Sequence, residues 1–185
     1  MHKNNVSIEI NRHIFHILSG TVLALLFYFN LIGRIHFAIL FAIGIGLFLI
    51  YKRFKIPIIH KVLLAMERKQ NLQKFPGKGA LFYMLGATLA VWIYPKEIAT
   101  ASILILAYGD GVAGFIRAFE KGPVKTWMST IVSIATATIA ARFIVPLVDA
   151  FTASLVVMLI ERFDLKIDDN LFIPVIAGGI IYILG

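Results

Sequence analysis

Long runs of apolar residues constrain this chain more than any other feature of its sequence. They lie at about residues 14–32, 36–51, 79–94, 97–116, 127–145, 147–161 and 170–185. A helix that crosses a bilayer core needs about 20 such residues, and somewhat fewer where protein covers it. The 185 residues are 59% hydrophobic and 15% charged, which is far more apolar than a soluble domain requires. We therefore predict an all-α fold, a polytopic membrane helical bundle of about seven transmembrane helices in a single integral membrane domain, residues 1–185.

The sixth run is the least certain of the predicted spans. It is short, and Pro146 separates it from the run before it. A proline inside a helix breaks or bends it, so residues 147–161 form either a separate helix, a half-helix or part of one bent span. Six spans are the alternative to seven.

Basic residues are concentrated in the connection between the second and third runs. Against the single acid Glu67, this connection holds Lys52, Arg53, Lys55, Lys61, Arg68, Lys69, Lys74 and Lys78. Loops rich in lysine and arginine stay on the cytoplasmic side, so we expect a cytoplasmic N-terminus and an outside C-terminus. Residues 58–66 are expected to form an amphipathic helix at the interface. The net charge of +8 then indicates contact with anionic membrane lipids and no nucleic-acid partner, since no groove-reading or base-stacking motif accompanies it.

Asp110 is an isolated acid within the apolar, glycine-rich run at residues 103–116. An ionised carboxylate at the centre of a membrane helix costs about 2.5–3.5 kcal/mol on insertion scales unless it has partners. Two interpretations fit the residue. Asp110 either binds a magnesium ion that bridges phosphates, or it pairs with an arginine or caps a broken helix. The adjacent Gly109 would let a ligand or another backbone approach closely.

Further charged and polar residues fall at the predicted cytoplasmic ends of the helices. Lys125 and Thr126 open a helix, where backbone N–H groups and the helix dipole favour phosphate. Arg12 and His16 share one face of the first helix and could clamp a phosphate, or could simply anchor that helix at the interface. Lys78 lies in a Pro-Gly-Lys-Gly segment that could also cradle phosphate.

A second group of acids surrounds the start of the last run. Glu161 ends the sixth run, and Asp169 and Asn170 precede the seventh. We expect Asp169 or Asn170 to cap the last helix. Glu161 and Asp169 are also predicted to lie level with Asp110, where carboxylates could hold magnesium. Such a cluster suits transfer between a soluble nucleotide and a lipid headgroup.

Four short elements of the chain, in the same order, resemble the CTP-dependent polyprenol kinase family. That family includes dolichol kinase, phytol kinase and CTP-using diacylglycerol kinase, and it is related to CDP-diacylglycerol synthases. The matching elements are Glu9-x-x-Arg12-x-x-x-His16, Gly109-Asp110-x-x-Ala113, Lys125-Thr126, and Glu161 with Asp169-Asn170-Leu171-x-Ile173-Pro174. The resemblance runs through nearly the whole chain. It departs at Arg117, where the family has a further glycine, and at Met128-Ser129-Thr130, where the family has Glu-Gly-Ser.

The resemblance implies a transferase in a cell membrane or an organelle membrane such as the endoplasmic reticulum. It would pass the γ-phosphoryl group of CTP, or of another nucleoside triphosphate, to a prenol-type or other lipid alcohol at the cytoplasmic face. The expected catalytic residues are Asp110, Lys125 and His16. The expected nucleotide and phosphate ligands are Arg12, Lys78, Gly109, Lys125, Thr126 and Asn170. The expected magnesium ligands are Asp110, Glu161 and Asp169.

Two other functions fit the same residues. One is a CDP-lipid synthase, but the extra histidine-glycine and paired-aspartate motif of those cytidylyltransferases has no counterpart between Lys125 and Arg142, which favours the kinase. The other is a protein without catalytic activity that binds or transports lipid through the same charged vestibule. The sequence leaves the lipid alcohol and the oligomeric state open.

Overall fold

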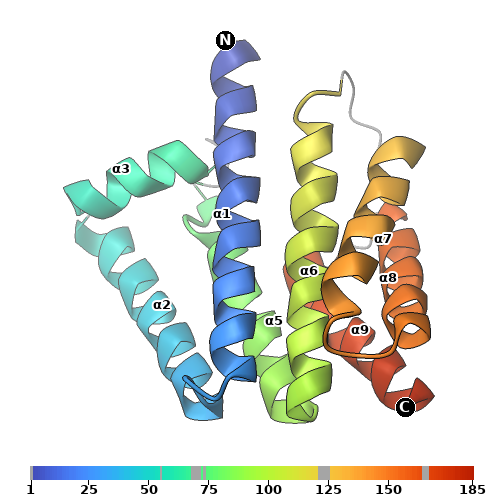
Figure 1. Ribbon diagram of the computed structural model, residues 1–185. Coiled ribbons are helices and arrows are strands. Elements are labelled where there is room, and N and C mark those ends of the chain that lie inside the picture. Colours follow the sequence, from blue (N-terminus) through green and yellow to red (C-terminus); the bar gives the residue numbers. More distant parts are fainter. Residues whose placement is uncertain (1, 55, 68–71, 73, 121–125, 164–166) are drawn as a thin grey trace.

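The computed structural model describes residues 2–54, 56–67, 72, 74–120, 126–163 and 167–185. Within these residues all regular structure is helical, which confirms the predicted all-α class (Figure 1). The helices are α1 (His2–Tyr28), α2 (Arg34–Phe54), α3 (Pro57–Met66), α5 (Lys78–Ile93), α6 (Lys96–Arg117), α7 (Trp127–Ala141), α8 (Leu147–Arg162) and α9 (Asp169–Leu184).

Most helix positions follow the apolar runs. The stretch expected to lie at an interface is α3, which has a proline in its first turn and runs across from the upper end of α2 toward α1 in Figure 1. The sixth run is a separate helix, because α8 begins after Pro146 and packs beside α7. The structure differs from the apolar run at about residues 14–32 at the start of α1, because this helix extends through the polar N-terminal segment to His2.

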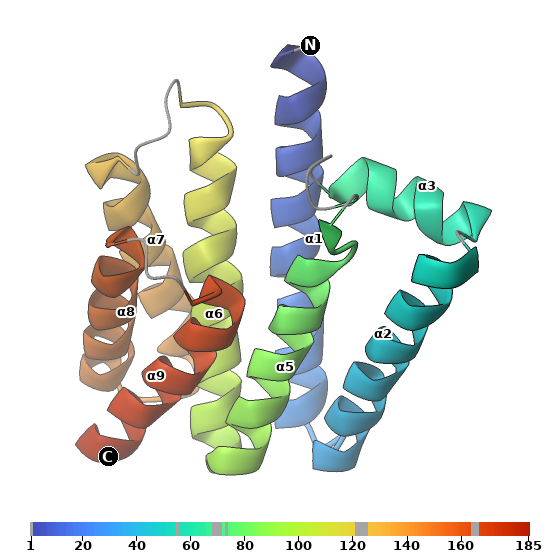
Figure 2. The same cartoon turned by 180° about the vertical axis from the view of Figure 1, so that it is seen from behind.

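Helix α6 is the centre of the bundle. It contacts α1, α5, α7, α8 and α9, and Figures 1 and 2 show α1 and α7 on one side of it and α5 and α9 on the other. Most of its buried residues are small, among them Ala99, Ala101, Ser102 and Ala107. Small side chains let helix backbones approach closely, so several helices can surround one central helix.

Glycines of α6 fix the position of α1. A Cβ atom added to Gly114 would lie 1.9 Å from Cε1 of His13, and one added to Gly111 would lie 2.5 Å from Cγ1 of Ile17. Neither contact leaves room for a larger residue. The pair His13 and Gly114 therefore sets the height of α1 against α6, and with it the level of His16, which lies one turn further along α1.

Within the described part of the chain, three helices are long and apolar enough to cross a membrane. They are Val6–Tyr28 within α1, Arg34–Phe54 and Lys96–Arg117. Helices α5, α7, α8 and α9 have 15 or 16 residues each. At 1.5 Å per residue such helices are about 24 Å long, shorter than a full hydrocarbon core. The two ends of the chain lie at opposite ends of the bundle (Figure 1).

Candidate functional site

Three carboxylates from three different helices converge. Asp110 of α6, Glu161 of α8 and Asp169 of α9 each contribute one oxygen, and these oxygens all lie within 4.8 Å of one another. Asp110 is only 9% exposed and Glu161 3%. Magnesium takes oxygen ligands at about 2.1 Å, so its neighbouring ligands are about 3 Å apart and opposite ones about 4 Å. A small inward movement of these side chains would therefore give three ligands of a divalent cation.

The start of α9 explains how Asp169 joins this group. The expected cap, Asp169 or Asn170, is wrong by one or two residues, because the N-cap is Asp168. Asp168 has an extended backbone and accepts a hydrogen bond from the Asn170 N–H at 3.3 Å. Asp169 is then the first helical residue, and its side chain is not needed as the cap.

Arg117 joins two of the three carboxylates. Its Nη2 lies 3.5 Å from Oδ1 of Asp110, and its Nη1 lies 3.1 Å from Oε1 of Glu161. Arg117 was not among the predicted site residues. A signal was present, because Arg117 follows Asp110 by seven residues and so lies on the same helix face. The two interpretations of Asp110, a cation site and an arginine partner, therefore fit one arrangement.

His16 of α1 closes another side of the site. Its Nε2 lies 3.7 Å from Oδ2 of Asp110, and among the described residues this buried nitrogen has no hydrogen-bond partner. The ring packs edge to face on Tyr83 of α5, with the centroids 4.6 Å apart. Tyr83 was not predicted, since an aromatic residue in an apolar run carries no sequence signal beyond core packing.

Arg12 and Lys78 lie near the three carboxylates, and each forms an ion pair with a different acid. Arg12 lies one turn from His16 on α1, with Nη2 2.8 Å from Oε2 of Glu9. The Lys78 Nζ lies 3.1 Å from Oδ2 of Asp168 at the start of α9. The Asn170 side-chain amide donates to the same aspartate at 3.1 Å. Both cations thus lie at the end of the bundle where the carboxylates meet.

The other predicted residues are placed differently. Thr126 caps α7, accepting from the Ser129 N–H at 3.2 Å and donating from its hydroxyl to Glu120. Gly109 faces α8, where an added Cβ atom would lie 2.7 Å from Cε of Met158. Gly109 therefore packs α6 against α8. Lys125 lies outside the described residues. Their roles toward a nucleotide stay predictions.

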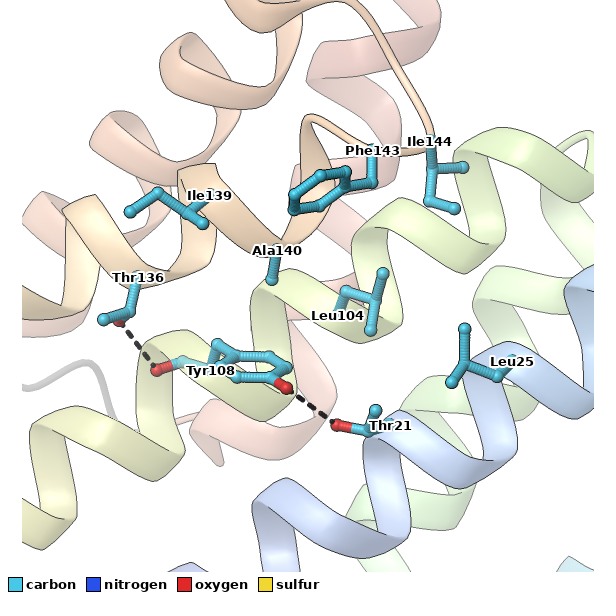
Figure 3. A pocket seen from close by; sticks show the side chains of 9 residues that line it. All are labelled: Thr21, Leu25, Leu104, Tyr108, Thr136, Ile139, Ala140, Phe143 and Ile144. Atoms are coloured by element: carbon cyan, nitrogen blue, oxygen red, sulfur yellow. Dashed lines mark hydrogen bonds between the residues drawn. The ribbon is translucent and has the colours of Figure 1, made fainter.

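A cavity of about 390 Å³ lies on the opposite face of α6 (Figure 3). Its lining residues come from α1, α6, α7 and the turn that follows α7. They are Thr21, Leu25, Leu104, Tyr108, Thr136, Ile139, Ala140, Phe143 and Ile144. The Thr21 hydroxyl donates to the Tyr108 hydroxyl at 3.4 Å. Residues two positions apart in an α-helix are about 200° apart around its axis. Tyr108 and Asp110 therefore point to opposite sides of α6. This cavity is separate from the carboxylate group.

The chain is similar to a protein of Methanocaldococcus jannaschii over nearly its full length. Over 184 residues the chain is 30% identical to "Uncharacterized protein MJ1137" of Methanocaldococcus jannaschii, a match that covers 94% of this chain and 92% of that protein. No family model matches the chain. No solved structure matches it either.

Proposed function

We propose that this chain, which belongs to the same family as protein MJ1137 of Methanocaldococcus jannaschii, is an integral membrane lipid kinase. It transfers the γ-phosphoryl group of a nucleoside triphosphate, CTP by resemblance, to a prenol-type or other lipid alcohol. The observation that carries the proposal is the convergence of Asp110, Glu161 and Asp169 at the level of His16. Such a group of acids within apolar helices is a functional site by default.

In this proposal α1, α2 and α5 to α9 cross the membrane, and α3 lies on its cytoplasmic surface. Helices of 15 or 16 residues are short for a bilayer, but neighbouring protein and local thinning accommodate short spans. The basic connection after α2 belongs to the cytoplasmic side. The carboxylates lie near that side because Glu161 is in the last turn of α8 and Asp169 begins α9.

Asp110, Glu161 and Asp169 would hold a magnesium ion, which neutralises phosphate charge in such reactions. Lys78, Arg12 and Lys125 supply positive charge for the nucleotide, and Thr126, Gly109 and Asn170 complete its predicted contacts. The lipid hydroxyl oxygen bonds to the γ-phosphorus as the bond from that phosphorus to the β–γ bridging oxygen breaks. CDP leaves with the electron pair of that bond. His16 is suited to receive the hydroxyl proton through its buried Nε2.

The proposal is tested with purified protein in lipid nanodiscs, labelled CTP or ATP, magnesium and a panel of lipid alcohols. A kinase produces phosphorylated lipid together with CDP from CTP or ADP from ATP. Release of pyrophosphate would instead identify a CDP-lipid synthase, and lipid binding without turnover would identify a binding or transport protein. Each of these two outcomes would overturn the proposal.

Asp110→Asn provides the residue-level test, with an expected loss of activity of about 100-fold or more. The matched control is Asp149→Asn, since Asp149 lies in the first turn of α8, at the end opposite Glu161. It should keep activity within about twofold of the unchanged protein. Full activity in Asp110→Asn would remove the carboxylate group from the mechanism.

A further inference from the structure

The Arg117 guanidinium occupies a position between two carboxylates that the proposed metal also needs. Its two terminal nitrogens contact different acids, Asp110 at 3.5 Å and Glu161 at 3.1 Å. Asp169 places a carboxylate oxygen within 4.8 Å of the oxygens of both acids. A planar guanidinium is well suited to bridging carboxylates in this way. A cation bound through Asp110 Oδ1 and Glu161 Oε1 would therefore compete with Arg117.

The charges of these groups favour a divalent ion over the arginine. Asp110, Glu161 and Asp169 carry a charge of −3, of which Arg117 offsets one unit and a divalent ion in its place would offset two. Arg117 is the last residue of α6, and its side chain is 24% exposed, so it has an exit toward solvent. The two carboxylates that it contacts have less access to solvent, because the side chains of Asp110 and Glu161 are 13% and 3% exposed. In these ion pairs, Arg117 is therefore the group that can move away from the site.

We propose that Arg117 is a built-in counter-cation for this site. It holds Asp110 and Glu161 in place before a divalent ion binds, and the incoming ion displaces it. The released guanidinium then binds phosphate oxygens of the nucleotide. This inference rests on the proposed metal site and assigns Arg117 a part in both metal and nucleotide recognition.

The test measures binding of Mn²⁺, as a probe, to the full chain in nanodiscs by electron paramagnetic resonance, without lipid substrate or turnover. Arg117→Gln should bind Mn²⁺ about tenfold more tightly, because the competing charge is gone. With Mn²⁺ present, the same variant should bind CTP about tenfold more weakly, because a phosphate ligand is gone. A residue that only supports the fold would weaken both, so opposite signs identify the proposed role.

Arg142→Gln is the matched control. It removes the same charge at the C-terminal end of α7, at the other end of the bundle from the carboxylates, and should change neither affinity by more than about twofold. Adding Asp110→Asn to Arg117→Gln should abolish the tighter Mn²⁺ binding, which locates the ion at the carboxylates. Equal Mn²⁺ affinity in Arg117→Gln and the unchanged protein would overturn the inference, even if the protein proves to be a magnesium-dependent kinase. Lack of Mn²⁺ binding in both would overturn it together with the metal site.

The unchanged protein gives an independent measurement if Arg117→Gln does not fold. An arginine-selective dicarbonyl reagent should modify Arg117 faster when Mn²⁺ is added, and more slowly again when CTP follows. Mass spectrometry of the peptide that contains Arg117 reads both changes. Slower modification on adding Mn²⁺ alone would contradict displacement by the metal.

Discussion

Two glycines, Gly114 of α6 and Gly46 of α2, differ in how closely other residues pack against them. A Cβ atom at Gly114 would lie 1.9 Å from the His13 ring, whereas one at Gly46 would have nothing within 4 Å. We expect Gly114→Ala to destabilise the protein by about 1–3 kcal/mol through overpacking. Gly46→Ala should instead stabilise it by about 0.5–1 kcal/mol through helix propensity. Thermal unfolding in one detergent measures both, and a shift of the same sign in both variants would contradict this packing of α1 on α6.

The two adjacent aspartates at the start of α9 should differ in their effect on metal binding. Asp169→Asn should weaken Mn²⁺ binding about tenfold or more, since it removes one of the three converging carboxylates. Asp168→Asn should change that affinity by less than about threefold, because asparagine still caps the helix and only the ion pair with Lys78 is lost. The reverse ranking would show that Asp168 is the ligand and that α9 begins differently.

The sequence predicts the acids of the site better than their partners. Asp110, Glu161 and Asp169 stand out because charge is costly among apolar residues, and the structure brings them within 4.8 Å of each other. Arg117 shares a helix face with Asp110, but its contact with Glu161 depends on how α6 and α8 pack. That packing is set by many small side chains, and no local pattern in the sequence specifies it.

Among the helices, the two faces of α6 have different environments. One face carries Asp110, and the other carries Tyr108 and the cavity of about 390 Å³. Ala140→Trp should fill that cavity while leaving Mn²⁺ affinity and nucleotide turnover within about twofold. The same binding and turnover assays check it. A tenfold loss of turnover with unchanged Mn²⁺ binding would mean that the lipid substrate uses the cavity.

Helix positions were predictable where apolar runs end at polar or proline residues. The run at 147–161 is α8, Leu147–Arg162, and the amphipathic stretch at 58–66 is α3, Pro57–Met66. The start of α1 was not predictable in the same way, because its first turns are polar and the apolar run begins only near residue 14. Apolar periodicity reports the buried or membrane-facing part of a helix, and a polar extension of the same helix carries no such signal.

At the scale of the whole molecule, charge asymmetry and the arrangement of helices agree with each other. The N-terminus and α3 lie at one end of the bundle and the C-terminus at the other (Figure 1). The basic residues Lys52 and Arg53 end α2 on the same side as α3, while Arg34 begins α2 at the opposite end. The asymmetry predicts orientation in the membrane through the positive-inside rule, which the fold alone cannot give.

Orientation can be measured directly because the chain contains no cysteine. Single cysteines placed at Lys61 of α3 and Arg34 of α2, both exposed, should react from opposite sides of the membrane. In intact cells an impermeant maleimide should label Arg34→Cys and leave Lys61→Cys unlabelled until the membrane is permeabilised. Labelling of Lys61→Cys alone in intact cells would invert the topology and place the carboxylates on the side without cytosolic nucleotide. Labelling of both would mean that α2 does not cross the bilayer, since its 21 residues separate these positions.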